Sequence, residues 1–364
     1  MHVSVVGGGV AGALLAWRLA QQPGVDRVTI APGAARRQDA TAASGGAVRG
    51  FEIEAVQRRL AIDSLGELLA DDRLRDWAGY TETGSLYRPR DTASIEAGAA
   101  EVSAARPDSV RLLTGAELRE RGWAGDDLDG SAVVAVEERQ AGYLDPERLR
   151  SRVLADLAQR GTVEVLADGA VTGLAPGSFT LVGAGHPAGT VHTSDILVLA
   201  TGAWTPALLR AYGWDGAGLR TKAIQYTIFG INGWRPGTFV DEVSGLYGKP
   251  AGTGQLLGLP TQAWDVEPGG PELGGPEPDS ALSDAVFELA QSRFPELRLV
   301  AGAQPVAALD CYSTDSLLAL RPVAGTDDRV LTFTGGSGGA AKTVLAASAR
   351  AATQLASGAA PHQT

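Results

Sequence analysis

The sequence predicts an α/β fold in which a Rossmann-like nucleotide-binding domain is interleaved with a second domain. Three observations support this prediction. A short apolar run, a glycine-rich turn and an apolar helix pattern follow one another in residues 2–20. Strand and helix patterns then alternate to the last predicted helix, Ala340–Leu355. The 364 residues suggest about two domains, and no linker is long enough to separate them cleanly.

The first of these stretches carries three glycines in the spacing G-x-G-x-x-G. The predicted strand His2–Val6 precedes them and the predicted helix Ala11–Leu19 follows, which is the order in which this spacing indicates dinucleotide binding. The first glycine allows a tight turn, the second lets the backbone approach a pyrophosphate, and the third lets helix and strand pack closely. The helix start offers N–H groups and partial positive charge to phosphates. An ordinary glycine-rich βα turn is the alternative. The predicted cofactor-binding residues here are Gly7, Gly9, Val10, Ala11 and Gly12.

The second predicted strand, Asp26–Ile30, lacks the acidic residue that usually follows it and holds the adenosine ribose. Ala31 and Pro32 stand there instead. Arg36, Arg37 or a backbone group could hold the ribose. The two arginines also leave open a 2′-phosphate, as in NADP.

Apolar periodicity and end-capping residues predict the remaining elements. Asp145 can cap a helix that has Pro146 in its first turn. Helices are predicted at 51–69, 115–121, 146–157, 281–294 and 340–355. Strands are predicted at 83–87, 133–136, 163–166, 170–174, 196–199, 222–229 and 331–334, with a hairpin at 179–181 and 189–192. Residues 93–105 and 268–278 are predicted to be surface segments, and 359–364 to be loose.

Composition excludes several classes of function. The net charge of −11 argues against nucleic acid as the main partner, because phosphate binding needs clustered Lys and Arg. The single cysteine excludes an intrachain disulfide and fits a reducing compartment, and with four histidines it argues against a structural metal site. No run approaches the ~18 apolar residues of a membrane span. No basic region precedes the first apolar run, so no signal peptide is predicted. We therefore expect a cytoplasmic protein with no metal, membrane or nucleic-acid partner.

Four blocks, in order along nearly the whole chain, carry a resemblance to a known family. They are the N-terminal glycine motif, GYLDP at 142–146, VLATGAW at 198–204 and TGGSGG at 334–339. Together they resemble the FAD-dependent oxidoreductase family of D-amino-acid oxidase, glycine oxidase and sarcosine oxidase. The first block alone is a weak signal, whereas all four in the right order are specific.

The resemblance implies an FAD-binding domain made of discontinuous segments, and a second domain with an antiparallel sheet over the flavin. We assign residues 1–80, 142–220 and 312–364 to the FAD-binding domain. Residues 81–141 and 221–311 are assigned to the substrate domain.

The resemblance also implies the chemistry of an amine or amino-acid oxidase similar to glycine oxidase. A hydride passes from the substrate carbon to flavin N5, the C–N bond is oxidised, the imine hydrolyses, and O2 reoxidises the flavin. An N-substituted glycine or another secondary amine is the expected kind of substrate. One alternative is a flavin-dependent dehydrogenase or hydroxylase of a biosynthetic pathway that does not use O2 as a simple oxidase acceptor. A nicotinamide-dependent dehydrogenase is a more distant alternative.

Further cofactor-binding residues follow from the same blocks and from the small-residue loop 41–49. Small residues and glycines allow backbone to lie against a flat ligand. Trp204 serves either packing or chemistry. These residues are Ser44, Gly45, Gly46, Ala47, Thr201, Gly202, Trp204, Gly335, Gly336, Ser337, Gly338, Gly339 and Ala340.

The flavin is expected to be bound non-covalently. In monomeric sarcosine oxidase a cysteine binds the flavin, one residue further from the following tyrosine than Cys311 is from Tyr312. Cys311 is therefore interpreted as a small core residue.

Five residues are candidates for catalysis or substrate binding: Arg49, Tyr247, Lys249, Asp310 and Tyr312. Arg49 falls where sarcosine oxidases carry an arginine near the flavin. It could face the flavin or a substrate carboxylate, or be a solvated arginine at a helix start. Tyr247 and Lys249 either line the pocket or form a turn between two strands.

Asp310 stands where the resemblance places the arginine that holds the substrate carboxylate in glycine oxidases. It could pair with a substrate ammonium, or be a buried carboxylate paired with a structural arginine. Like charges repel strongly where water is excluded, so glycine and D-alanine are expected to be poor substrates and a larger amine to be preferred. A substrate acid group would then bind Arg49, Arg88 or Lys249.

Two further lysine positions depend on the resemblance. The oxygen-activating lysine of sarcosine oxidase matches Leu256 here, although Lys249 is close in sequence. Lys342 could neutralise the N1 side of the flavin, or be a solvated charge on the last helix.

Overall fold

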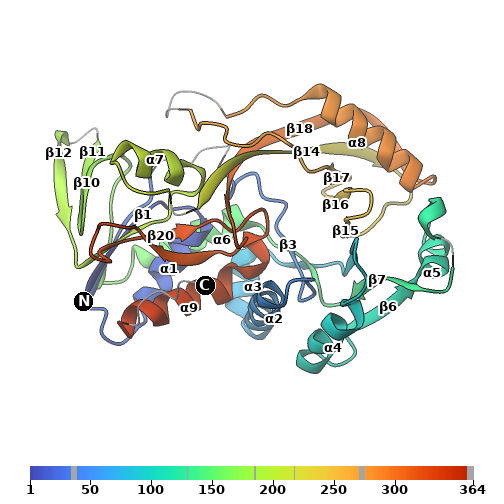
Figure 1. Ribbon diagram of the computed structural model, residues 1–364, viewed down its shortest axis with the longest axis horizontal. Helices are drawn as coiled ribbons and strands as arrows, with labels where there is room; N and C mark the ends of the chain where they lie inside the picture. Colours follow the sequence, from blue (N-terminus) through green and yellow to red (C-terminus); the bar gives the residue numbers. More distant parts are fainter. Residues whose placement is uncertain (34–38, 129, 184–185, 217, 270–274, 359–364) are drawn as a thin grey trace.

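The computed structural model describes residues 1–33, 39–128, 130–183, 186–216, 218–269 and 275–358. Its described part contains two large sheets and two small ones, and the large sheets lie in different halves of the molecule (Figure 1). The mixed α/β class and the interleaving predicted from the sequence are confirmed, because the chain enters each large sheet more than once.

Sheet A has six strands in the order β19-β20-β13-β1-β2-β9. All neighbours are parallel except β19 and β20. Its strands are almost entirely apolar because both faces are covered, as is typical of parallel sheets. The strands are β1 His2–Val6, β2 Arg27–Ala31, β9 Val163–Val165, β13 Ile196–Leu199, β19 Ala319–Pro322 and β20 Val330–Thr334.

Helices cover one face of sheet A, and a small sheet with one helix covers the other. α1 (Val10–Leu19), α6 (Pro146–Leu157) and α9 (Ala340–Ala356) share one apolar core with the sheet. α6 begins as predicted, because the Asp145 side chain accepts a hydrogen bond from Arg148 N at 3.0 Å and Pro146 occupies its first turn. On the other face lie α7 (Thr205–Ala211) and the antiparallel strands β10 Ala170–Ala175, β11 Ser178–Gly183 and β12 His186–Thr193.

Sheet B has eight strands in the order β18-β14-β17-β16-β15-β5-β7-β6. It is antiparallel throughout except for the pair β15 and β5. The long strands β14 and β18 run side by side towards sheet A (Figure 1). The strands are β5 Ser85–Arg88, β6 Val110–Thr114, β7 Val133–Glu138, β14 Leu219–Asn232, β15 Phe239–Asp241, β16 Tyr247–Ala251, β17 Gly254–Gly258 and β18 Arg298–Ser313.

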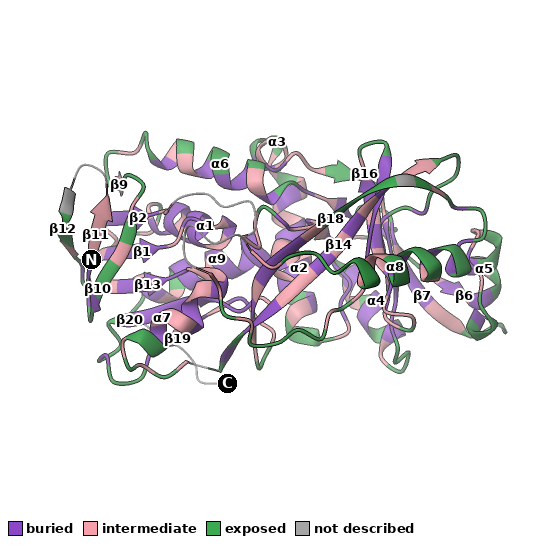
Figure 2. Ribbon diagram, turned by 90° about the horizontal axis from the view of Figure 1, so that it is seen from above, coloured by how far each residue is buried: buried purple, intermediate pink, exposed green. Residues whose placement is uncertain are grey.

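Side chains alternate between the two faces of β14, and this alternation positions the site. Gln225 and Thr227 hydrogen-bond Ser283 of α8 (Ser280–Arg293), whereas Lys222 and Ile224 line a cavity on the other face. α8 is exposed on its outer side (Figure 2).

Short elements connect the two halves. The second small sheet is antiparallel, with the order β3-β8-β4. These elements are β3 Ala47–Val48, β4 Thr81–Glu82, β8 Gly142–Tyr143, α2 Ala55–Ala70, α3 Asp72–Ala78, α4 Ile95–Ala105 and α5 Gly115–Glu120, with 3-10 turns at Asp126–Leu128 and Gly202–Trp204.

The structure corrects several sequence predictions. Residues 95–105 form a helix, not an irregular surface segment, because Ile95, Ala99 and Val102 have helical spacing and are buried. α2 begins at Ala55 instead of residue 51, because residues 50–53 are held by other side chains described below. The strands β6, β18 and β19 and the helix α3 were not predicted. Residues 270–274 of one predicted loop and the tail 359–364 lie outside the described residues. The domain boundaries given above stay a prediction.

Among the helices of the described ranges, none is both long enough and apolar enough to cross a membrane.

Candidate cofactor and substrate site

A cavity of about 1050 Å³ is lined by residues of both large sheets. It opens where β1, β13 and β20 end, which is the edge at which parallel sheets bind ligands. Every residue predicted to bind the cofactor lines this cavity except Gly12. The five catalytic candidates Arg49, Tyr247, Lys249, Asp310 and Tyr312 line it as well. Their roles stay a prediction, but the structure brings them together.

Two glycines of the N-terminal motif are required by close packing. Gly7 has φ +110°, and a Cβ atom there would lie 2.3 Å from the Ala200 carbonyl oxygen. At Gly12 a Cβ atom would lie 2.0 Å from the Gly7 carbonyl oxygen and 2.9 Å from Ala200 Cβ. Gly12 therefore brings α1 against the strand ends, as its place in the motif predicts.

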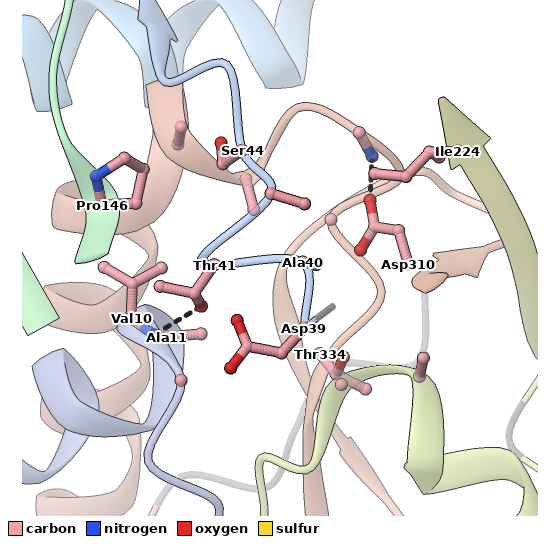
Figure 3. Close-up of a pocket in the computed structure, with 18 of the residues that line it drawn as sticks. Val10, Ala11, Asp39, Ala40, Thr41, Ser44, Pro146, Ile224, Asp310 and Thr334 are labelled. Atoms are coloured by element: carbon pink, nitrogen blue, oxygen red, sulfur yellow. Dashed lines mark hydrogen bonds between the residues drawn. The ribbon is translucent and has the colours of Figure 1, made fainter. Parts of the chain in front are cut away.

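The N-terminus of α1 faces the cavity. Val10 N donates a hydrogen bond to Thr41 Oγ1 at 3.1 Å (Figure 3). Gly9, the residue before the helix, supplies no side-chain cap. Val10 and Ala11 line the cavity, so the first turn presents its positive end to a diphosphate. Sequence reasoning missed Thr41, whose only signal is its place in a small-residue loop.

Asp39 is a second residue that sequence reasoning missed. Its side chain points into the cavity between α1 and β20 (Figure 3). The carboxylate accepts a hydrogen bond from Ala42 N at 2.7 Å and contacts the buried Arg150 at 2.9 Å. Arg150 thereby neutralises the carboxylate and fixes the loop that carries Thr41.

At the adenosine end of the cavity, an acidic residue that follows β9 takes the place of the missing acid after β2. Pro32 and Gly33 line this end after β2. Because β9 lies parallel and next to β2, the residues after both strands meet at one edge, and Asp168 lines the cavity there. Asp168 can accept hydrogen bonds from ribose hydroxyls. Arg36 and Arg37, the candidates for this role, lie outside the described residues.

The loop before α9 is tied to β18 and closes the other side of the cavity. Ser313 N donates to Ser337 Oγ at 3.1 Å, and Gly338 N donates to Asp310 Oδ2 at 2.9 Å. Gly335 and Gly338 have φ of +88° and +75°, conformations that favour glycine. These bonds hold the start of α9 at the cavity wall, where Ala340 and Lys342 line it.

Asp310 has backbone partners, so the structural-arginine alternative is wrong. Its carboxylate accepts from Cys311 N at 2.8 Å and from Gly338 N (Figure 3). Burial raises the pKa of Asp310 to about 6, although both backbone donors act in the opposite direction. Cys311 is 1% exposed and is not part of the cavity lining, unlike its neighbours Asp310 and Tyr312. Its interpretation as a small core residue is confirmed.

Arg49 is buried, Lys342 is half-buried and both are paired, so neither is a solvated helix charge. Arg49 is 5% exposed, and its Nη2 lies 2.6 Å from Glu52 Oε1. Lys342 Nζ lies 2.9 Å from the same oxygen. Burial alone would raise the pKa of Glu52, but the two cations bring it below its usual range. Sequence reasoning missed Glu52, because its partner Lys342 is far away in the chain.

Tyr247 and Lys249 line the cavity from β16. Lys249 and Leu256 are direct neighbours across β16 and β17, and both line the cavity. The Lys249 ammonium lies 4.0 Å from the centre of the Tyr143 ring, and burial lowers the pKa of Lys249. Tyr247 donates to the Gln225 carbonyl at 3.0 Å, and burial raises the pKa of Tyr247. These residues lie in strands, so the turn interpretation is wrong.

Lys222 is a buried cation that the sequence did not single out. It is 8% exposed and lines the cavity. Its ammonium lies 4.5 Å from the Trp264 ring centre and 5.3 Å from that of Tyr312. Burial lowers the pKa of Lys222. Arg88, by contrast, contacts Asp127 and Asp241 and is not part of the cavity lining, so it is not available to a substrate there.

The cavity fits a dinucleotide that carries a flavin. It has a glycine turn with no room for side chains, two helix N-termini at its wall, and space that continues to aromatic and charged residues of sheet B.

Comparison with known proteins agrees with this geometry. The family described as FAD dependent oxidoreductase matches residues 2–355. A comparison with the curated proteins finds no match.

Solved structures share the fold at low sequence identity. L-proline dehydrogenase from P. horikoshii has a TM-score of 0.75 and 17% identity, covering 100% of this chain and 94% of that chain. Glycine oxidase from Geobacillus kaustophilus has a TM-score of 0.72 and 18% identity, covering 98% and 94%. L-α-glycerophosphate oxidase from Mycoplasma pneumoniae, with FAD bound, has a TM-score of 0.73 and 17% identity, covering 98% and 94%.

Proposed function

Because the chain belongs to the family of FAD-dependent oxidoreductases, we propose that it is an oxidase that acts on the C–N bond of an amine or amino acid. FAD is the cofactor, and when bound it supplies the hydride acceptor. The imine product then hydrolyses in water. Glycine oxidase and L-proline dehydrogenase among the similar structures support a nitrogen-containing substrate.

The observation that carries the proposal is one cavity with two different ends. At one end the glycine motif, Thr41 and the start of α1 fit a diphosphate. At the other end sheet B contributes aromatic, aliphatic and cationic side chains, which can exclude water and orient a substrate. The residues of that end include Ile224, Tyr226, Tyr247, Lys249, Leu256 and Tyr312.

We infer that the substrate binds as a neutral amine beside Tyr247 and Tyr312. Tyr247 and Tyr312 are half-buried, and partial exclusion of water disfavours the charged ammonium. Among the described residues the cavity wall holds no serine–histidine or cysteine–histidine pair. The residues of this chain therefore bind and orient the substrate and exclude water from it.

Molecular oxygen is the proposed acceptor. Lys249 supports this, because it places a half-buried cation beside Leu256 on the cavity wall. A fixed positive charge stabilises the negative charge that develops when oxygen is reduced.

The experiment is a screen of amines against the purified holoenzyme. We expect loss of flavin absorbance without oxygen, and hydrogen peroxide release with oxygen, for at least one secondary amine or N-alkyl glycine. Glycine and D-alanine are expected to be slower than a larger amine. Bleaching without peroxide release would favour the dehydrogenase alternative. If no amine in the panel reduces the flavin, the proposed C–N oxidation is wrong.

A further inference from the structure

One wall of the cavity carries a compact group of charges that sum to zero. Glu52 Oε1 contacts both Arg49 Nη2 at 2.6 Å and Lys342 Nζ at 2.9 Å. The Arg49 guanidinium also lies over the Tyr87 ring at 4.5 Å, and Glu242 accepts a hydrogen bond from the Tyr87 hydroxyl. All five residues line the cavity. Two cations and two carboxylates therefore face the same space.

The backbone that carries Glu52 is held in place by buried charged side chains. Gly50 N and Phe51 N donate to the Glu138 carboxylate at 2.8 and 3.0 Å. Arg58 Nη1 donates to the Glu52 carbonyl at 2.7 Å. Glu138 is 1% exposed and Arg58 5%, so the side chains that support this backbone are shielded from water. Glu52 thus belongs to a preorganised wall and is not a mobile surface carboxylate.

The group lies at the sheet B end of the cavity, away from the nucleotide end. Tyr87 and Glu242 belong to β5 and the segment after β15, whereas the glycine motif lies at the ends of sheet A strands. Lys342 and Arg49 approach from α9 and from the segment after β3. A substrate in the space left by the cofactor meets this wall.

We propose that Glu52 determines substrate specificity by pairing with both Arg49 and Lys342, so that this wall accepts an uncharged or cationic part of the substrate and rejects a carboxylate. The substrate class is then an amine without a carboxylate at this end, or an amino-acid derivative whose carboxyl group is an amide or ester. This inference rests on the proposed function, because it concerns the substrate end of the same cavity.

The physical reason is charge compensation in a water-poor site. The attraction of Arg49 and Lys342 is already offset by Glu52 and Glu242, so an entering carboxylate would leave the wall with a net negative charge, and like charges repel strongly at low dielectric constant. It would also have to separate an ion pair whose partners are already buried, which leaves a charge without a partner. An amide of the same shape meets neither obstacle and can donate a hydrogen bond to a carboxylate.

Ligand binding to the wild-type holoenzyme tests the proposal without any substitution. Benzamide and benzoate have nearly the same shape and differ in charge. Each is titrated against the enzyme while the flavin absorption spectrum is followed. We expect benzamide to bind at least ten-fold more tightly than benzoate. Equal or tighter binding of benzoate would overturn the proposal.

A matched pair of variants then assigns the effect to Glu52. Glu52→Gln keeps the shape of the side chain but releases Arg49 and Lys342, so benzoate affinity should rise at least ten-fold while benzamide affinity changes little. The control, Glu164→Gln, removes the same charge from a half-buried residue of β9 that pairs with Arg27 and is not part of the cavity lining. It should leave both affinities unchanged.

An unchanged preference for benzamide in Glu52→Gln would show that Glu52 does not set the specificity. If this variant loses its flavin, the wild-type comparison still decides whether the wall rejects a carboxylate. The binding readout does not depend on turnover. A failure of the proposed amine oxidation would appear as an unreduced flavin and leave the ligand preference measurable.

Discussion

At the scale of a single residue, the protonation of Asp310 makes the stability of the folded protein depend on pH. Its folded-state pKa of about 6 lies above the value of 3.8 for an unperturbed aspartate, because burial disfavours the carboxylate. The folded protein therefore holds this proton more tightly than the unfolded chain. The resulting stability is complete below about pH 4 and is lost as the pH rises through 6.

We expect Asp310→Asn to remove this pH dependence. The variant loses one acceptor for the N–H groups of Cys311 and Gly338, so it should be less stable than wild type at pH 4.5. The difference in stability between the two proteins should be smaller at pH 7.5 than at pH 4.5, because only the wild type has a carboxyl group that ionises at this position. Thermal unfolding of both proteins at the two pH values measures this. A difference that stays constant would contradict the raised pKa.

At the scale of the elements, flavin binding depends on the close contact between α1 and the ends of β1 and β13. A Cβ atom at Gly12 would meet backbone at 2.0 Å, whereas one at Gly9 would meet only Thr41 Oγ1 at 3.2 Å. Overpacking of this kind typically costs about 1–3 kcal/mol. We therefore expect Gly12→Ala to lose most of its flavin and to unfold several degrees lower.

Gly9→Ala is the matched control for that prediction. A threonine hydroxyl can rotate or shift slightly, so Gly9→Ala should lose less flavin than Gly12→Ala, although the backbone at Gly9 approaches the pyrophosphate. The ratio of flavin to protein absorbance after purification measures both variants. Equal flavin content in the two would show that helix packing at Gly12 does not limit cofactor binding. Larger side chains at either position, such as Gly9→Val and Gly12→Val, are expected to abolish binding.

At the scale of the whole molecule, FAD binding depends on both large sheets, because residues of both line the cavity. The side chain of Cys311 is buried and is not part of the cavity lining. We therefore expect acid precipitation to leave the flavin in the supernatant and Cys311→Ser to keep its flavin. Yellow colour in the washed pellet would contradict non-covalent binding.

Non-covalent binding also makes stability depend on FAD concentration. A ligand at a hundred times its Kd stabilises the folded state by about 2.7 kcal/mol. Added FAD should therefore raise the unfolding temperature of protein from which the flavin has been removed. An unchanged unfolding temperature on addition of FAD would show that the cofactor does not stabilise the contact between the two sheets.

Much of sheet A and its glycine-rich turns could be predicted because the signals are local. Apolar runs mark β1, β13 and β20, and the Asp145–Pro146 pair marks the start of α6. Sheet B was harder. The 16-residue strand β18 carries no continuous alternation of apolar and polar residues, and its register is set by its long pairing with β14.

The sequence by itself determined the family, the cofactor and the set of segments that meet at the cavity, because glycine spacing and capping residues act within a few positions of one another. Only the tertiary structure decided which charges are paired. Glu52 lies between Arg49 and Lys342, Asp310 binds backbone N–H groups, and Lys222 contacts two aromatic rings. Lys342, Gly338, Trp264 and Tyr312 are distant in the chain from the charges that they contact, and the free energy of a buried charge depends on its neighbours in space.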